Sequence, residues 1–463
     1  MEYRIGKGIG CAFLILMSNA TMAATTNLGS YGKTQLQQDT GDAVQSTCGG
    51  FVAQGFDPNY SLFATCRAMV HTGNALTGTG AAADSLGLSE DQLASSLQQI
   101  AAEEFLTTGS VSNELATEKA TPVLSRLSTL RSGTKGFSLS NLTPLGNPDM
   151  VVGAPQVQRG GSAGVDGPGS PLSGFATFDY GFGSRDGTAN ADEFDFDSYH
   201  LVAGLDYQLN PNFVIGAAIG YFVVDSEFKV TSDVAGGDTE IDGFSVMGYF
   251  SWYSESFYVD GFAGLGTSDY DMTRHIVIPS ATAVSAIDET AISSTDSDDY
   301  TISVGGGYMG TSGSVTWQPY LRVAYSNTDI AAYDESGADA SGLNLHVDGQ
   351  EWSSLTSSLG IDLSNAVSKD FGVLIPFLQL GWIHEFENDE TTVTAFYIDD
   401  LFLSETHVLA AGTDEPDQNY FELGFGISAV FKNGQQLFFK YDSLLGLKNV
   451  TSHLVTLGAR WEF

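Results

Sequence analysis

From residue 174 to the end of the chain, apolar and polar side chains alternate with a period of two residues. Successive side chains of a β-strand point to opposite faces, so this pattern predicts strands with one apolar face. The alternation runs over 10–16 residues in the clearest segments, whereas strands of soluble domains usually have ~5–6 residues. Such lengths are typical of tilted strands that cross a membrane with lipid on one side and a polar lumen on the other. In the last segment the apolar face comprises Val455, Leu457, Ala459, Trp461 and Phe463.

Twelve segments show this pattern, and the connections between them alternate in length. Tight turns alternate with stretches of about 10, 11, 31, 23, 34 and 9 residues. Short turns at one end and long loops at the other are typical of bacterial outer-membrane barrels. We therefore predict an all-β membrane barrel with twelve antiparallel transmembrane strands, preceded by a small α-helical N-terminal domain. The predicted strands are 173–184, 195–208, 211–228, 240–252, 257–268, 300–309, 315–328, 352–366, 372–384, 419–431, 435–443 and 453–463.

The chain before the barrel divides into three parts. Residues 1–23 combine a basic start, a short apolar stretch and small residues, which is typical of a secretory signal peptide. Residues 24–141 carry the helical patterns, so we predict a small helical passenger-like domain there. Residues 142–173 are rich in Gly and Pro without periodicity, which predicts a linker. The barrel then occupies residues 174–463.

Two helical segments stand out in the N-terminal domain. Ser89 and Gln92 have the spacing of a capping box at the start of a helix. Further along, Val123, Leu127 and Leu130 recur at helical spacing. We expect these apolar stripes to form a helix-on-helix core of the N-terminal domain rather than a cofactor site.

Export into an oxidising compartment leaves two cysteines, Cys48 and Cys66, after removal of the signal peptide. A lone pair of cysteines in an exported protein usually forms a disulfide, and we expect one here. Closing a loop of this length stabilises the fold by about 3 kcal/mol on the chain-entropy model. A metal site is the alternative, but it needs more ligands than the nearby His71 supplies.

The chain has 18 Lys and Arg against 56 Asp and Glu, a formal net charge of −38. This balance excludes nucleic acid as a partner, because binding phosphates requires clustered basic side chains. About half of the acidic residues fall in the predicted long connections, and none of their clusters has the spacing of a calcium loop. We predict no cofactor, with loosely bound Ca²⁺ or Mg²⁺ at the acidic loops as the alternative. The clusters are Asp296, Asp298 and Asp299; Glu385, Glu387, Asp389 and Glu390; and Asp414, Glu415 and Asp417.

Six charged residues within the predicted strands fall on or near the lumen-facing side of the alternation. A basic side chain on the lipid side would cost ~2–4 kcal/mol at the membrane midplane, whereas in the lumen it is hydrated or paired. The lumen-facing charged residues are Arg322, Glu422, Lys440, Arg460 and Glu462, with Asp206 at the same parity.

Short motifs along residues 174–463 occur in a characteristic order. They are Gly204-Leu205-Asp206-Tyr207, Gly220-Tyr221, Pro319-Tyr320-Leu321-Arg322, His384-Glu385-Phe386, Asn433-Gly434 and the closing Trp461-Glu462-Phe463. In this order they resemble the autotransporter β-domain, the outer-membrane translocator barrel of type V secretion. The resemblance implies a Gram-negative outer membrane, with lipid and lipopolysaccharide as surroundings. It also implies that Trp461 and Phe463 form the signal for the barrel assembly machinery.

The function that follows is translocation or display of the short helical domain by the barrel. The alternative is a non-exporting pore or surface-binding barrel with a periplasmic or plugging N-terminal domain. We predict no enzymatic activity, because no protease triad occurs before residue 174, where His71 is the only histidine. The sequence identifies no ligand at the cell surface.

Overall fold

The structure of the chain is a computed structural model. It describes residues 27–102, 119, 121–128, 171–231, 233–387, 390–432 and 435–462. The predicted signal peptide, nearly all of the predicted linker and the terminal Phe463 lie outside the described residues, so these assignments stay predictions.

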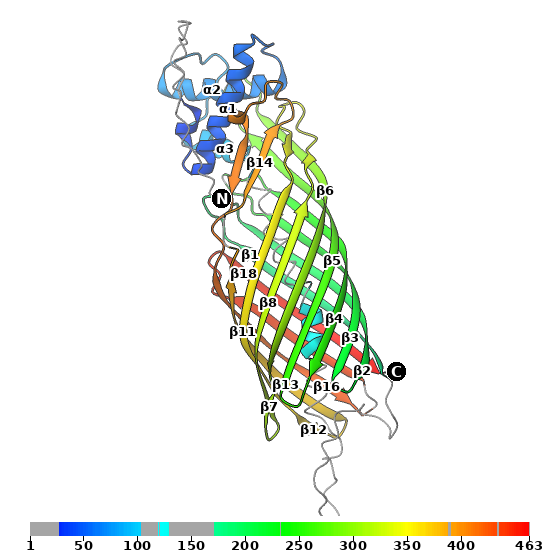
Figure 1. Ribbon diagram of the computed structural model, residues 1–463. Coiled ribbons are helices and arrows are strands. Elements are labelled where there is room, and N and C mark those ends of the chain that lie inside the picture. The colour runs from blue at the N-terminus through cyan, green and yellow to red at the C-terminus, as the bar shows by residue number, and fades with distance from the viewer. Residues whose placement is uncertain are drawn as a thin grey trace, which may run out of the picture.

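The described strands include twelve long ones that close into an antiparallel barrel. Figure 1 shows the wall of this barrel. Each strand pairs with its neighbour along the chain, and the last strand pairs with the first, with Leu457 opposite Phe178. Each of these strands therefore has two neighbours in the wall, as a barrel in lipid requires. The predicted fold class is confirmed. The strands are β1 (Leu172–Arg185), β2 (Phe194–Asn210), β3 (Phe213–Phe228), β4 (Gly237–Tyr253), β5 (Phe257–Ile278), β6 (Ile287–Tyr308), β8 (Val315–Ile330), β11 (Gln350–Asn365), β13 (Gly372–Glu385), β16 (Asn419–Phe431), β17 (Gln436–Leu445) and β18 (Val450–Glu462).

The alternation in the sequence becomes an inside and an outside of the barrel wall. In β18, Thr456 is fully buried on the lumen side, while the neighbouring Leu457 is 51% exposed on the outside. In β3, Ala218 is buried and Ile219 is 64% exposed. Exposed leucines and isoleucines at this frequency would be unfavourable in water, but they match a lipid-facing apolar band.

The two ends of the barrel differ in their connections. β2 and β3 join through Pro211 and Asn212, and short strands β7 (Gly310–Ser312) and β12 (Val367–Lys369) lie at two other turns of the same end. The opposite end carries the long connections, two of which contribute a second, four-stranded sheet. We call these the short-turn end and the long-connection end. The second sheet has the order β15 (Leu409–Gly412), β14 (Thr392–Tyr397), β10 (Leu345–Val347) and β9 (Tyr333–Asp334).

One predicted connection is wrong. The sequence pattern predicts a long loop over 269–299, but β5 and β6 continue through this stretch and pair up to Ile278 and Ile287. The period of two persists there, with Asp269 and Asp271 exposed on the outside and Tyr270 buried on the inside. The outward positions become polar because the two strands extend beyond the apolar band.

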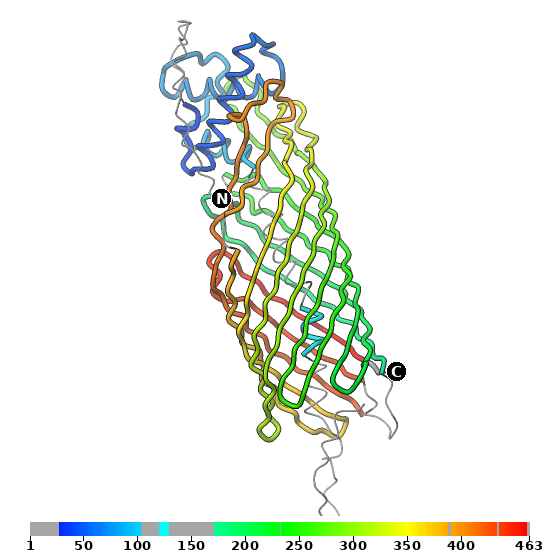
Figure 2. The backbone as a smooth tube through the Cα atoms, in the orientation of Figure 1, coloured from blue at the N-terminus to red at the C-terminus, as the bar shows by residue number. Residues whose placement is uncertain are grey.

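The part of the N-terminal domain that the structure describes over residues 27–102 contains a 3₁₀ turn and three helices. It lies at the long-connection end of the barrel (Figure 2). Thr34 and Gln37 form a capping box at the first α-helix, and the predicted box of Ser89 and Gln92 starts the third. Among the described residues, no helix is both long and apolar enough to cross a membrane. The elements are η1 (Leu28–Tyr31), α1 (Gln35–Ala53), α2 (Ser61–Thr77) and α3 (Glu90–Gln98).

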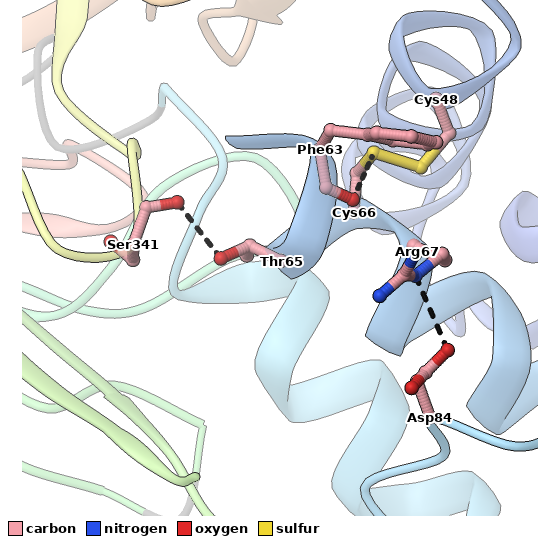
Figure 3. Close-up of a disulfide and its surroundings, with 7 residues drawn as sticks. All are labelled: Cys48, Phe63, Thr65, Cys66, Arg67, Asp84 and Ser341. Carbon is pink, nitrogen blue, oxygen red and sulfur yellow. Dashed lines mark hydrogen bonds and ion pairs between the residues drawn. A yellow bond between two sulfur atoms is a disulfide. The ribbon is translucent and has the colours of Figure 1, made fainter. Parts of the chain in front are cut away.

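A disulfide between Cys48 and Cys66 joins α1 to α2, as Figure 3 shows. Both cysteines are buried, and the ring of Phe63 stacks on that of Phe51 beside them, at 5.4 Å between centroids. Figure 3 also shows Thr65 of α2 donating a hydrogen bond to the carbonyl of Ser341, 2.8 Å away, in the β9–β10 connection. The disulfide therefore fixes two helices that also contact the barrel.

The N-terminal domain and the barrel share one hydrophobic core. This core joins residues from the helices, from the second sheet and from the inner wall of the barrel near its long-connection end. We call residues 27–102 the cap, because they cover this end of the barrel. Representative members of the shared core are Phe51, Leu62, Leu93 and Leu97 of the cap, Leu345, Val393 and Tyr397 of the second sheet, and Phe222, Tyr270 and Ile276 of the wall.

Candidate functional site: the occupied lumen and the cap

A helical segment, residues 121–128, lies inside the barrel, where Figure 1 shows it in cyan between the strands. Val123 and Leu127 are fully buried and pack with Phe175 of β1 and Val202 of β2. The expectation that this stripe forms a helix-on-helix core of the N-terminal domain is therefore wrong. The stripe packs against an apolar patch of the lumen wall. Its helical spacing would be the same whether it packed against another helix or against this wall.

Arg126 fixes this segment to β2 and β1. Its Nη2 atom donates to both carboxylate oxygens of Asp206, each at 2.6 Å, and its Nε atom donates to Oδ1 at 3.0 Å. Ser173 accepts from the same guanidinium at 2.9 Å and donates to Asp206 at 2.8 Å. The guanidinium also lies over the ring of Phe175. This network joins the segment to the start of the first strand.

Lys119 makes a second contact, with β6 and β3. Its ammonium donates to Asp299 at 2.6 Å and lies 4.1 Å from the ring centroid of Phe222. Both charged side chains are buried. Removing one partner of a buried ion pair typically costs 3–5 kcal/mol, because the other charge stays uncompensated. The two pairs therefore specify one position for the chain in the lumen.

Three of the predicted lumen-facing residues, Arg322, Glu422 and Lys440, line one cavity of about 170 Å³ together with Leu124 and Ser125 of the lumen segment. This cavity lies on the side of the segment that faces β8, β11, β13, β16 and β17. The segment is thus held against one part of the wall and leaves polar space at another.

The predicted lumen charges find partners within the wall. Arg322 donates to Asp260, and Lys440 pairs with Asp442 at 2.9 Å. Glu422 accepts a hydrogen bond from Gln379 at 3.1 Å.

The remaining lumen and terminal residues are described only in part. Arg460 lines a small hollow beside Arg126. Glu462 and Trp461 lie in β18, but their side chains are outside what the structure describes. The assembly role of Trp461 and Phe463 stays a prediction.

The cap contacts the barrel through a buried arginine of β5. Arg274 makes an ion pair with Glu335, with its Nε atom 2.9 Å from Oε1, and both side chains are buried. Its Nη1 atom donates to the carbonyl of Gln99 just after α3, 3.2 Å away, and its Nη2 atom donates to that of Leu343 at 3.1 Å. One side chain thus connects the barrel wall, the β9–β10 connection and the cap.

A second contact joins α1 to the connection between β14 and β15. Phe402 places its ring 5.3 Å from that of Phe51 and 5.5 Å from that of Phe56. Beside it, His407 forms a buried 2.5 Å contact with Asp400 and lies against Gly50 of α1. The β14–β15 connection therefore completes the aromatic core around the disulfide.

The acidic clusters do not converge on a metal site. In the ranges that the structure describes, no group of three or more His, Cys, Asp or Glu side chains is arranged to hold a metal ion. Asp299 pairs with Lys119, Asp414 with Arg185 and Asp417 with Lys448. Loose cation binding at the acidic loops stays a proposal.

Sequence reasoning placed Asp206 on the lumen side but did not find its partner. The pairs Arg126–Asp206 and Lys119–Asp299 join residues 80 and 180 positions apart. The usable signal is a pair of basic residues, Lys119 and Arg126, in a helical segment with one apolar stripe just before the linker. Arg274 carries a similar signal. It lies within the stretch that is predicted to be a loop, at an inward-facing position of the period-two pattern that continues there.

The closed barrel, its lipid-facing apolar band and its two unlike ends define an outer-membrane β-barrel. The family model of the autotransporter beta-domain matches residues 174–442, and the chain belongs to this family. The predicted resemblance is confirmed. No curated protein sequence matches the chain.

The solved structures that are similar to the chain include three autotransporter domains. The translocator domain of autotransporter NalP from Neisseria meningitidis is 18% identical, over 64% of this chain and 90% of that chain, with a TM-score of 0.48. The beta domain of the Bordetella autotransporter Brka is 17% identical, over 64% and 100%, with a TM-score of 0.43. The transport unit of the autotransporter AIDA-I from Escherichia coli is 16% identical, over 63% and 90%, with a TM-score of 0.43.

Proposed function

We propose that the barrel carries the N-terminal domain across the outer membrane and retains it on the cell surface as a fixed cap. The observation that carries this proposal is the position of residues 121–128. They lie in the lumen, with the cap at the long-connection end and the start of β1 at the short-turn end. Long connections of outer-membrane barrels face the outside, so a domain docked on them is expected at the surface.

Retention is supported by the extent of the docking. The cap shares its hydrophobic core with the second sheet and the barrel wall, and Arg274 and Phe402 bridge the parts. A passenger destined for release would need to break these contacts. We therefore expect the exported chain to stay intact and attached, after a signal peptide at residues 1–23 has directed it through the inner membrane.

Surface labelling of intact cells tests the proposal. An epitope inserted after Thr79, in the exposed turn between α2 and α3, should bind antibody on intact cells. The same epitope inserted after Glu255, in the β4–β5 turn at the short-turn end, should bind only after permeabilisation. The reverse pattern would show that the domain is periplasmic and would support the alternative of a plugged or pore-forming barrel.

Retention is tested separately. Cells are washed, and the medium and the membrane fraction are probed for the Thr79 epitope after heating and reduction. We expect the epitope in the membrane fraction, on a chain that also carries the barrel. A free N-terminal fragment in the medium would contradict retention but not export.

A further inference from the structure

Two carboxylates from separate connections meet one face of α3. Asp192 belongs to the connection between β1 and β2, and Asp233 belongs to the connection between β3 and β4. Gln98 donates its Nε2 hydrogen to Asp192 Oδ1 at 3.4 Å, and Ser95 donates its hydroxyl hydrogen to Asp233 Oδ1. Ser95 and Gln98 are three residues apart, so they lie on the same face of the helix. α3 is therefore docked on a pair of acidic groups.

Basic groups lie nearby but contact other carboxylates. Lys33, just before α1, pairs with Asp91 of α3 at 2.8 Å, and the charge of Asp233 acts on the same ammonium. Lys229 pairs with Glu193 at 2.7 Å, and it also contacts Asp195 at 3.1 Å. Asp192 thus lies near Gln98 and the negative charge of Asp233. Lys33 and Lys229 form their ion pairs with carboxylates other than Asp192.

The proton on Asp192 is held more firmly when α3 is docked. Burial, opposed by the hydrogen bond from Gln98 and reinforced by the charge of Asp233, raises the pKa of Asp192 to about 7. When the helix moves away, this carboxyl returns toward an ordinary pKa of ~3.9. The docked state binds more protons between these two pH values, so docking is strongest in acid and weakens as the pH rises toward 7, above which it levels off.

We propose that α3 and the two connections form a pH-responsive latch, which is closed when Asp192 is protonated and loosened when Asp192 and Asp233 both carry charge. When the latch loosens, α3 is the part of the cap that moves, and α3 packs against the barrel wall. Leu93 and Leu97 of α3 belong to the core that includes Ile276 of β5. On the other side of the cap, Phe402 packs against α1 and keeps the domain attached. The latch therefore controls how firmly α3 packs on the inner wall, without release of the cap.

Hydrogen–deuterium exchange on the full-length protein in lipid nanodiscs tests the latch. Protection of the amides of residues 90–98, corrected for the intrinsic pH dependence of exchange, is compared at pH 6 and pH 8.5. With pKa values near 7 docked and ~3.9 undocked, linkage predicts about a tenfold loss of protection at the higher pH. Protection of the β-barrel strand β8 should stay constant.

Two variants separate the latch from a general effect of pH. Asp192→Asn removes the titrating group but keeps its shape, so α3 should stay protected at pH 8.5 and lose the pH dependence. Asp186→Asn, an exposed position of the same connection, should behave like the unmodified protein. The proposal is overturned if the unmodified protein shows no change in α3 protection, or if Asp192→Asn keeps the same tenfold change.

Discussion

Arg126 and Asp206 hold the chain at one position inside the barrel, with the guanidinium against both oxygens of a carboxylate from β2. Both side chains are almost fully buried. Because the hydroxyl of Ser173 joins the same network, the pair also touches the first residues of the barrel. The chain in the lumen and the wall that surrounds it are thus connected by this charge pair, in addition to that of Lys119 and Asp299.

Replacing Arg126 should release the lumen segment. Arg126→Leu leaves Asp206 buried without its cation, which should cost the docked state about 3–5 kcal/mol. A Ser125→Cys substitution reports on this through its labelling by a maleimide, since Cys48 and Cys66 are joined in a disulfide. We expect faster labelling in Arg126→Leu. The double variant Arg126→Leu with Asp206→Leu should recover slow labelling in part, and equal rates in all three proteins would contradict the role of the pair.

Phe402 should be needed for a stable cap. Phe402→Ser removes the ring that packs on Phe51 and Phe56, with an expected loss of roughly 2–4 kcal/mol. The neighbouring Leu401 is 56% exposed, so Leu401→Ser is the matched control, with a change within about 0.5 kcal/mol. Limited trypsin digestion of the folded protein, read by the survival of the cap, distinguishes the two. Similar digestion rates for both variants would show that the connection does not stabilise the cap.

The two faces of β18 should respond differently to charge. Leu457→Arg places a cation on the lipid face at a cost of ~2–4 kcal/mol, whereas Arg460→Leu removes one from the lumen side. We expect a lower yield of folded barrel for Leu457→Arg, measured as the heat-modifiable band on a gel. Equal yields would contradict the assignment of the two faces.

Divalent cations should stabilise the outer surface of the strand extensions. Asp242, Asp269 and Asp296 lie opposite one another across β4, β5 and β6, and like charges in such positions repel. Mg²⁺ should slow proteolysis of the extended β5–β6 hairpin, and EDTA should accelerate it. Asp269→Asn should reduce this response, whereas Glu405→Gln, at an exposed position in the β14–β15 connection, should keep it. If EDTA leaves the proteolysis unchanged in the unmodified protein, loose cation binding fails as an explanation.

The sequence predicts the barrel well because each strand repeats a local rule. The alternation around Leu457 and Thr456 needs no knowledge of the neighbouring strands to assign two faces. Near Asp269 the alternation of apolar outward and polar inward residues no longer holds. The outward positions are polar there because the wall extends beyond the lipid, while inward positions such as Tyr270 stay apolar.

The lumen contacts depend on information that no local pattern contains. Val123 and Leu127 describe one apolar stripe, and the stripe fits a helical core as well as it fits a barrel wall. Only the three-dimensional arrangement selects Phe175 and Val202 as its partners. The same holds for Arg274, whose acceptors come from the cap and from two places in the β9–β10 connection.

The lumen segment also gives the molecule a lasso-like topology, with the chain passing through a ring made from its own C-terminal strands. On one side of the ring the disulfide between Cys48 and Cys66 joins two helices of the cap. The cap therefore resists being unfolded and drawn back through the barrel. On the other side the chain is continuous with β1, which is zipped to β18 along its length. A pulling force from the short-turn end would therefore have to unfold the cap or open the barrel before the chain in the lumen could move. The barrel thus gives the small cap a resistance to mechanical force that the cap alone would lack.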